Sequence, residues 1–170
     1  MFKKLESSER IGLFIIDATV IFIASQLAIA WILGPDLYTL ADLQLSLRPN
    51  HFYEILGSLS EQSISRLLDH FYLDFFHPFF YGTALYLMLA FFRQHLKFPR
   101  HFIFLPFIAS FADFFENIAE LFIIIEINTR HDEIFYVASG FSFLKWITVL
   151  ICLLQLTFYS ILFLRMKIRD

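Results

Sequence analysis

Four long apolar stretches are the feature of this sequence that most limits how the chain can fold. They cover residues 11–33, 71–92, 102–125 and 141–164, each 22 to 24 residues long, and a helix needs about 20 apolar residues to cross a bilayer. A transmembrane β-barrel would instead show alternating segments of about 10 residues. The sequence therefore predicts an all-α polytopic membrane protein, with four transmembrane helices in an antiparallel bundle and a single membrane domain over 1–170.

The composition agrees with this fold and excludes several other classes. Apolar residues make up 58% of the chain and charged residues 17%, against about 45–50% and about 25% in soluble domains. The net charge is −3, which argues against a nucleic-acid partner. Cys152 is the one cysteine, so an internal disulfide or a cysteine zinc cluster is excluded. Because the sequence contains no glycine-rich phosphate loop, HExxH, CxxC or GxSxG motif, no cofactor is expected.

The basic residues predict how the four stretches cross the membrane. Nine lie before the first stretch, between the second and third, or after the fourth: Lys3, Lys4, Arg10, Arg93, Lys97, Arg100, Arg165, Lys167 and Arg169. Three lie on the other side: Arg48, Arg66 and Arg130. The positive-inside rule then places both termini in the cytoplasm, and a bacterial inner (plasma) membrane is the expected location. A cleaved signal peptide ending at Ala28-Ile29-Ala30 is the alternative for the N-terminus.

The outer loop over residues 34–70 contains a further apolar pattern. Seven apolar residues follow approximate helical spacing: Phe52, Ile55, Leu56, Leu59, Leu67, Leu68 and Phe71. The pattern predicts one amphipathic helix on the outer membrane surface. This helix would act either as a cover packed on the bundle or as a lid over a site.

Ionisable residues inside the predicted spans indicate a functional site, because such residues are costly in a bilayer. The third span carries Asp113, Glu116, Asn117 and Glu120 at i, i+3, i+4 and i+7. This spacing places all four on one stripe of a helix, and the stripe must face the bundle interior or a wet cavity.

The second and fourth spans supply matching groups. Asp74, His77 and Tyr81 share a face of the second span. Pro78 cannot donate to the Asp74 carbonyl, so a kink and a free carbonyl are expected there. Gly82 would allow a close contact between helices.

Lys145 is the one cation inside these spans. It is expected to pair with Glu120, Glu116 or Asp74, with Glu120 at the same level. Both residues also have purely structural alternatives. Lys145 would then snorkel to the membrane interface, and His77 would only form a hydrogen bond to a neighbouring helix.

The predicted binding site combines residues from three spans: Asp74, His77, Asp113, Glu116, Asn117, Glu120 and Lys145. Asp17 in the first span and Tyr81 are secondary members. Five acids against one lysine require that the surplus carboxylates be protonated, bound to a cation or wetted. No dedicated metal site is expected, because only one helix of the site carries a histidine.

Three polar pieces give the sequence a family resemblance. They are Asp74-Phe-Phe-His-Pro78-Phe-Phe-Tyr81-Gly82, Asp113-Phe-Phe-Glu116-Asn117 and Ser142-Phe-Leu-Lys145-Trp146. Together they resemble the polar signature of a group of small, uncharacterised four-helix integral membrane proteins, which implies the fold and the choice of polar residues but no activity. Asp74-x-x-His77-x-x-x-Tyr81 also resembles VanZ-like proteins, but the acidic-Asn-Gly run expected after the third span is missing, and we do not adopt that assignment.

Three functions fit these features. The first is a site that binds or passes protons, cations or a small polar solute, which in so short a chain implies a homo-oligomer or a partner membrane subunit. The second is a membrane-embedded enzyme acting on a lipid or lipid-linked substrate at the outer leaflet. The third is a non-catalytic assembly or accessory subunit. Membrane lipid is an expected partner in each case, and the sequence leaves open whether the protein is an enzyme.

Overall fold

The fold is seen in a computed structural model that describes residues 2–169, with side chains over residues 10–168. Helices are the only regular secondary structure in the described part of the chain, which contains no strand. Its elements are α1 (Phe2–Leu33), η1 (Gly34–Asp36), α2 (Leu37–Gln44), α3 (Pro49–Ser58), α4 (Glu61–Asp74), α5 (His77–His95), η2 (Arg100–Phe104), α6 (Leu105–Ile125) and α7 (Asp132–Arg169). The all-α prediction is therefore confirmed.

Two helical stretches, Arg10–Gln44 and Asp132–Ile168, are long and apolar enough to cross a membrane. A third is added if α4 and α5, which meet at a bend of 42°, form one broken span. Apolar side chains of α1 and α7 are widely exposed, for example Phe14 at 59% and Leu154 at 62%. Exposed apolar surface of this extent is typical of a membrane protein.

The second predicted span, 71–92, is not one continuous helix. Its first residues belong to α4, which ends at Asp74, and α5 begins at His77. The break lies just before Pro78, which occupies the first turn of α5, where a missing N–H costs little because it has no partner within the helix. The expected kink near Pro78 is confirmed, and it takes the form of a break between two helices.

The last two predicted spans have different boundaries in the structure. The helix expected over 102–125 begins at Leu105, and the helix expected over 141–164 extends from Asp132 to Arg169. The polar start of α7 packs against α3, and Phe135 is 2% exposed. The first part of α7 is too polar to be predicted as a span from hydropathy. Contacts with the rest of the protein, and not with lipid, stabilise it.

The single amphipathic helix predicted in the loop 34–70 is wrong, because the loop contains η1, α2, α3 and α4. The chain is extended at Leu59 and Ser60, and the Ser60 hydroxyl accepts a hydrogen bond from the Ser63 N–H at 3.1 Å. Ser60 therefore caps a new helix in the middle of the apolar pattern.

The apolar sides of these loop helices pack on the ends of the long helices and act as a cover. The shared core cluster consists of Ile29, Leu33, Leu40, Leu43, Phe52, Leu56, Leu67, Phe71, Ile123, Ile124 and Phe135. Leu33 and Phe52 are among the least exposed of these, at 0% and 2%. We call this end of the molecule the capped end.

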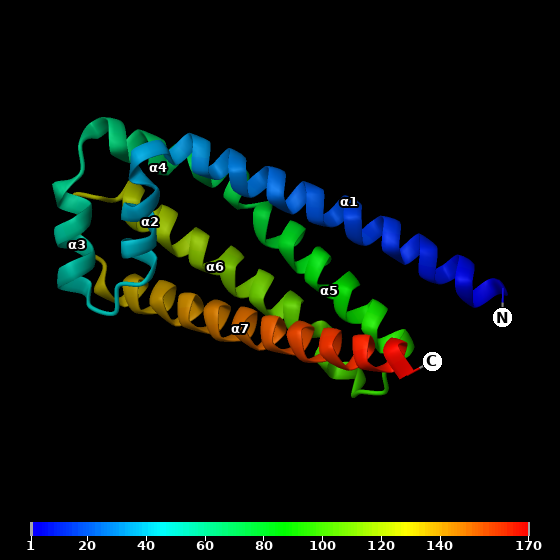
Figure 1. Cartoon of the computed structure of the whole chain (residues 1–170). Coiled ribbons are helices and arrows are strands. Elements are labelled where there is room, and N and C mark those ends of the chain that lie inside the picture. The colour runs from blue at the N-terminus through cyan, green and yellow to red at the C-terminus, as the bar shows by residue number, and fades with distance from the viewer. Residues whose placement is uncertain (1, 170) are drawn as a thin grey trace.

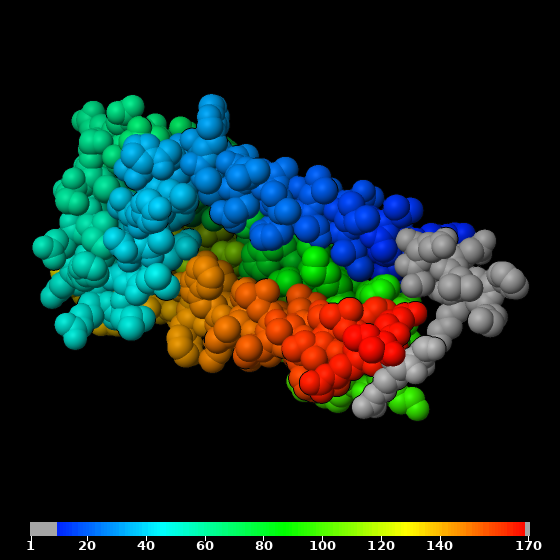
Figure 2. Space-filling model, in the orientation of Figure 1, coloured from blue at the N-terminus to red at the C-terminus, as the bar shows by residue number. Residues whose placement is uncertain are grey.

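The long helices extend away from the capped end (Figure 1). α1 packs on α5, α5 on α6, and α6 on α7. Both termini lie at the end opposite the cap. Between α1 and α7 the surface is hollowed, and atoms of α5 are visible at the bottom of the hollow (Figure 2).

Candidate functional site

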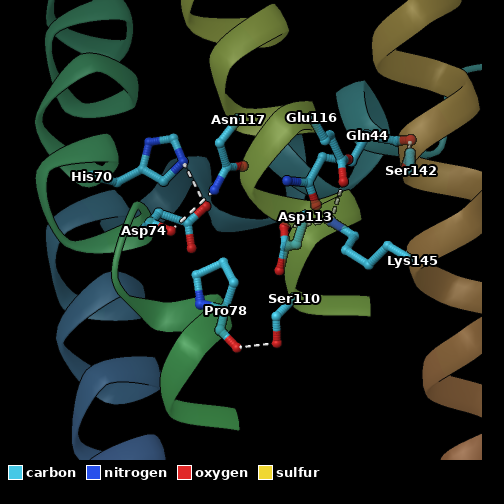
Figure 3. Close-up of polar contacts among 10 residues, drawn as sticks. All are labelled: Gln44, His70, Asp74, Pro78, Ser110, Asp113, Glu116, Asn117, Ser142 and Lys145. Atoms are coloured by element: carbon cyan, nitrogen blue, oxygen red, sulfur yellow. Dashed lines mark hydrogen bonds and ion pairs between the residues drawn. The ribbon is translucent and has the colours of Figure 1, made fainter. Parts of the chain in front are cut away.

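Lys145 lies between two carboxylates of α6 and forms the centre of the site (Figure 3). Its Nζ is 2.6 Å from Glu116 Oε2 and 3.1 Å from Asp113 Oδ1. The side chains are 7%, 0% and 8% exposed for Lys145, Glu116 and Asp113. Lys145 is therefore not snorkelling to the interface. Its single charge is shared by two buried acids, and such a cluster tolerates the loss of its cation poorly.

Of the three partners predicted for Lys145, Glu116 is confirmed, whereas Glu120, expected at the same level, and Asp74 form no ion pair with it. Glu120 is buried, at 3% exposed, but within residues 10–168 it forms no ion pair. The reason is the helix register. α7 begins at Asp132, nine residues before the predicted start of the fourth span, and α6 ends at Ile125. Lys145 is then about as far into α7 as Asp113 is from the end of α6, so these two residues meet.

Asn117 satisfies the backbone carbonyl that Pro78 leaves free. Its Nδ2 donates to the Asp74 carbonyl at 3.0 Å, and Asn117 is 0% exposed. A buried carbonyl without a donor would cost about 1–3 kcal/mol. The polar stripe of α6 thus closes the break between α4 and α5, and it fixes the position of Asp74.

His77 connects the site to α1. Its Nδ1 is 2.8 Å from Ser25 Oγ, which also lies 2.8 Å from the Phe22 carbonyl oxygen. The Ser25 hydroxyl can donate to either partner, so this contact is compatible with either tautomer of His77. The hydrogen bond to a neighbouring helix, one of the alternatives for His77, is therefore present.

Gly82 allows α5 and α6 to approach closely, as predicted. A Cβ built on Gly82 would lie 1.9 Å from Ser110 Oγ and 3.4 Å from the Pro106 carbonyl oxygen. Ser110 in turn donates across the interface to the Pro78 carbonyl at 2.6 Å. This contact holds α6, with its acids, against the first turns of α5.

A cavity of about 550 Å³ lies beside the cluster. Its charged and ionisable lining lies on the half nearer the capped end and consists of Asp74, His77, Tyr81, Asp113 and Lys145, and the neutral polar residues Thr19, Gln26 and Gln44 also line it. Apolar residues cover most of the remaining wall: Phe22, Ile29, Leu37, Leu40, Ala41, Ala84, Leu85, Met88, Trp146, Val149, Leu153 and Leu156. The volume falls in the range of small-molecule sites.

The predicted site residues fall into three groups. Asp113, Glu116 and Lys145 meet directly, and Asp74, His77 and Tyr81 line the same cavity as Asp113 and Lys145. Asn117 acts through the Asp74 backbone. Glu120 lies buried but apart from the ion pairs, and Asp17 is exposed on α1 and does not line the cavity.

Two contributors were missed by the sequence analysis. Ser25 bonds His77 across helices, and His70 is 0% exposed with its Nε2 3.8 Å from Asp74 Oδ2 (Figure 3). His70 falls in the predicted loop, so only its spacing of i, i+4 to Asp74 could have indicated the contact.

A second cavity of about 450 Å³ lies at the capped end. It contains charges of both signs, and its Arg130 is already bonded to Asp132 at 2.6 Å and to Asn50 at 2.6 Å. No group of three or more His, Cys, Asp or Glu side chains in the described part of the chain is placed to hold a metal ion. The cavity beside Lys145 is therefore the candidate site.

No family model matches this chain, and neither a curated protein nor a solved structure matches it. The family resemblance of the polar pieces therefore remains a prediction.

Proposed function

We propose that this chain is a four-span integral membrane protein that binds one single-chain amphiphile from the bilayer. The polar head would lie against Asp74, His77 and Asp113, and the apolar chain would lie between α1 and α7. The observation that carries the proposal is the form of the cavity, which is mostly apolar, charged in the half nearer the capped end and hollowed between two lipid-facing helices (Figure 2). A cavity that opens sideways favours a ligand arriving from the bilayer over a solute crossing it.

The positions of the basic segments support four crossings in alternating directions. Both termini and the connection between α5 and α6 lie at the end opposite the cap (Figure 1). These segments carry the nine basic residues that predict a cytoplasmic side. In this arrangement α6 is a span despite its acids, because α5 and α7 cover its polar stripe. The capped end is then external, and the polar wall of the cavity faces the outer leaflet.

Cysteine accessibility in intact cells tests this topology. In a Cys152→Ser background, Leu47→Cys places a thiol at an exposed position before α3, and Lys97→Cys places one in the exposed connection after α5. A membrane-impermeant maleimide is expected to label Leu47→Cys in intact cells, and Lys97→Cys only after permeabilisation. Equal labelling of both variants in intact cells would refute the four-span arrangement.

The polar wall also indicates the class of head group. Lys145 is bonded to two carboxylates, so little of its charge is left to attract an anion. The other charged groups of the wall are the carboxyl groups of Asp74 and Asp113, and the neutral polar residues beside them can donate or accept: Thr19, Gln26, Gln44, His77 and Tyr81. A wall with two carboxyl groups fits a cationic or hydrogen-bond-donating head group.

Trp146 provides a reporter, because it lines the cavity. In a Trp31→Phe background it is the only tryptophan, since the chain has two. Dodecyl amphiphiles with two bromines in mid-chain are added to the protein in phosphatidylcholine nanodiscs. We expect saturable quenching of Trp146 by the ammonium and alcohol forms. Binding of the sulfate form is expected to be at least about tenfold weaker, since about 1.4 kcal/mol of repulsion is enough for that factor.

A pair of matched variants separates the cavity from the bilayer. Ala41 is exposed and lines the cavity, whereas Ala24 is exposed on α1 outside it. Ala41→Phe should abolish saturable quenching and Ala24→Phe should preserve it. Quenching that never saturates, or that Ala41→Phe leaves unchanged, would contradict the proposal.

A further inference from the structure

His70 is held in one tautomer by its own helix. Its Nδ1 contacts the Leu67 carbonyl oxygen, which can only accept, so Nδ1 must carry a proton. The ring is 0% exposed. Its other nitrogen, Nε2, is buried and has no hydrogen-bond partner among the described residues. A neutral His70 therefore directs a bare acceptor into the interior.

The group nearest to that acceptor is an acid. Asp74 Oδ2 lies 3.8 Å from His70 Nε2, one helical turn further along α4 (Figure 3). A bare nitrogen and an ionised carboxylate in a buried site repel each other, and neither can satisfy the other. A proton on His70 Nε2 turns the contact into an ion pair with the Asp74 carboxylate. A proton on Asp74 instead gives a carboxylic acid donor that faces the bare nitrogen of His70.

The other charged groups near Asp74 do not remove this requirement. Asp113 and Glu116 on α6 add negative charge, and Lys145 on α7 is bonded to both of them. His77 Nδ1 on α5 shares a hydrogen bond with the Ser25 hydroxyl of α1. Among residues 10–168 no lysine or arginine pairs with Asp74, which leaves a proton shared with His70 or a cation supplied by a ligand.

We propose that His70 and Asp74 hold a single proton between them in the empty cavity and release it to water when a cationic head group binds beside Asp74. This inference rests on the proposed binding function and narrows its ligand class to cationic amphiphiles. One positive charge enters and one leaves, so the charge of the site is unchanged. His70 is a positioning residue, because Asp74 and not His70 lines the cavity.

Calorimetry of dodecylammonium binding tests the exchange. The protein is held in phosphatidylcholine nanodiscs, titrations are run in two buffers of different ionisation enthalpy, and the cavity-blocked Ala41→Phe variant supplies the partition background. The wild type should release one proton per bound probe, and the affinity should fall by up to tenfold for each pH unit of acidification. Dodecanol should bind without proton release. Asp74→Asn should bind dodecylammonium more weakly and release no proton.

His95 is a matched control, because it forms the same kind of backbone contact as His70 but has no acid beside it in the described part of the chain. His95 Nδ1 also contacts a carbonyl of its own helix, that of Phe91 at 3.0 Å, but no carboxylate faces it within residues 10–168. His95→Gln should leave proton release unchanged, and His70→Gln should reduce it. Ring-nitrogen NMR of the ligand-free wild type should find the His70 proton on Nδ1.

The outcomes separate the two proposals. Saturable binding without proton release, or a His70 ring with a bare Nδ1, would overturn the proton-holding pair and leave the binding site intact. If Ala41→Phe and the wild type bind dodecylammonium alike, the binding function itself fails, and the inference fails with it.

Discussion

Replacing Lys145 with methionine is expected to destabilise the folded protein by about 3–5 kcal/mol at neutral pH, the cost of leaving buried charges without their partner. Lys145 is the cation that pairs with both Asp113 and Glu116, at 3.1 and 2.6 Å. Its loss leaves two buried carboxylates unpaired. At lower pH these groups can take up protons and lose their charge. The deficit relative to wild type should therefore shrink as the pH falls, and thermal unfolding in detergent across pH measures it.

Two further variants make the Lys145 result specific. Lys97 is exposed after α5, so Lys97→Met should change stability by no more than about 0.5 kcal/mol. Adding Asp113→Asn and Glu116→Gln to Lys145→Met removes every charge of the cluster and should restore most of the stability at neutral pH. A Lys145→Met variant as stable as wild type at all pH values would show that the cluster does not hold the fold together.

Gly82→Ala is expected to cost about 1–3 kcal/mol, as for other insertions into a packed interior. The new Cβ would lie 1.9 Å from Ser110 Oγ, which is held by its bond to the Pro78 carbonyl at 2.6 Å. Relief requires either that this bond breaks or that α5 and α6 separate. Chemical denaturation of the variant in detergent measures the loss.

A second glycine provides the control for Gly82. A Cβ on Gly140, inside α7, would meet nothing within 4 Å. Gly140→Ala should therefore be neutral or stabilising, by up to about 1 kcal/mol, because alanine favours the helix. Ser110→Gly combined with Gly82→Ala should cost less than the sum of the two single changes. Strict additivity, or equal effects at both glycines, would contradict the close contact.

Several parts of the fold follow from the sequence alone, because local chemistry decides them. Pro78 must disturb the helix at Asp74, since it lacks an N–H, and the break lies there. The spacing of Asp113, Glu116 and Asn117 places them on one side of α6, and all three are buried. Gly82 is the place where the neighbouring helix approaches.

Other parts could not be predicted because they depend on contacts distant in sequence. The start of α7 is polar, and its Phe135 packs against Phe52 of α3 with ring centroids 5.2 Å apart. Without that contact hydropathy places the start of the helix nine residues too late, so Glu120 is placed level with Lys145 and Asp113 is missed as its partner. His70 was missed for a related reason. The sequence places His70 in the outer loop and Asp74 in the second span, so the two residues are predicted in different regions. Their contact can be predicted only once α4 is known to continue from the loop to Asp74.

Native mass spectrometry of the intact protein, released from nanodiscs of bacterial lipid extract, tests the central claim most directly. The account predicts one retained amphiphile per wild-type chain, with a cationic or hydrogen-bond-donating head. It also predicts the same occupancy in Ala24→Phe and at least about tenfold lower occupancy in Ala41→Phe, which blocks the cavity. Wild-type protein that retains no amphiphile, or Ala41→Phe that retains the same one to the same extent, would contradict the assignment of this cavity as a lipid-facing binding site.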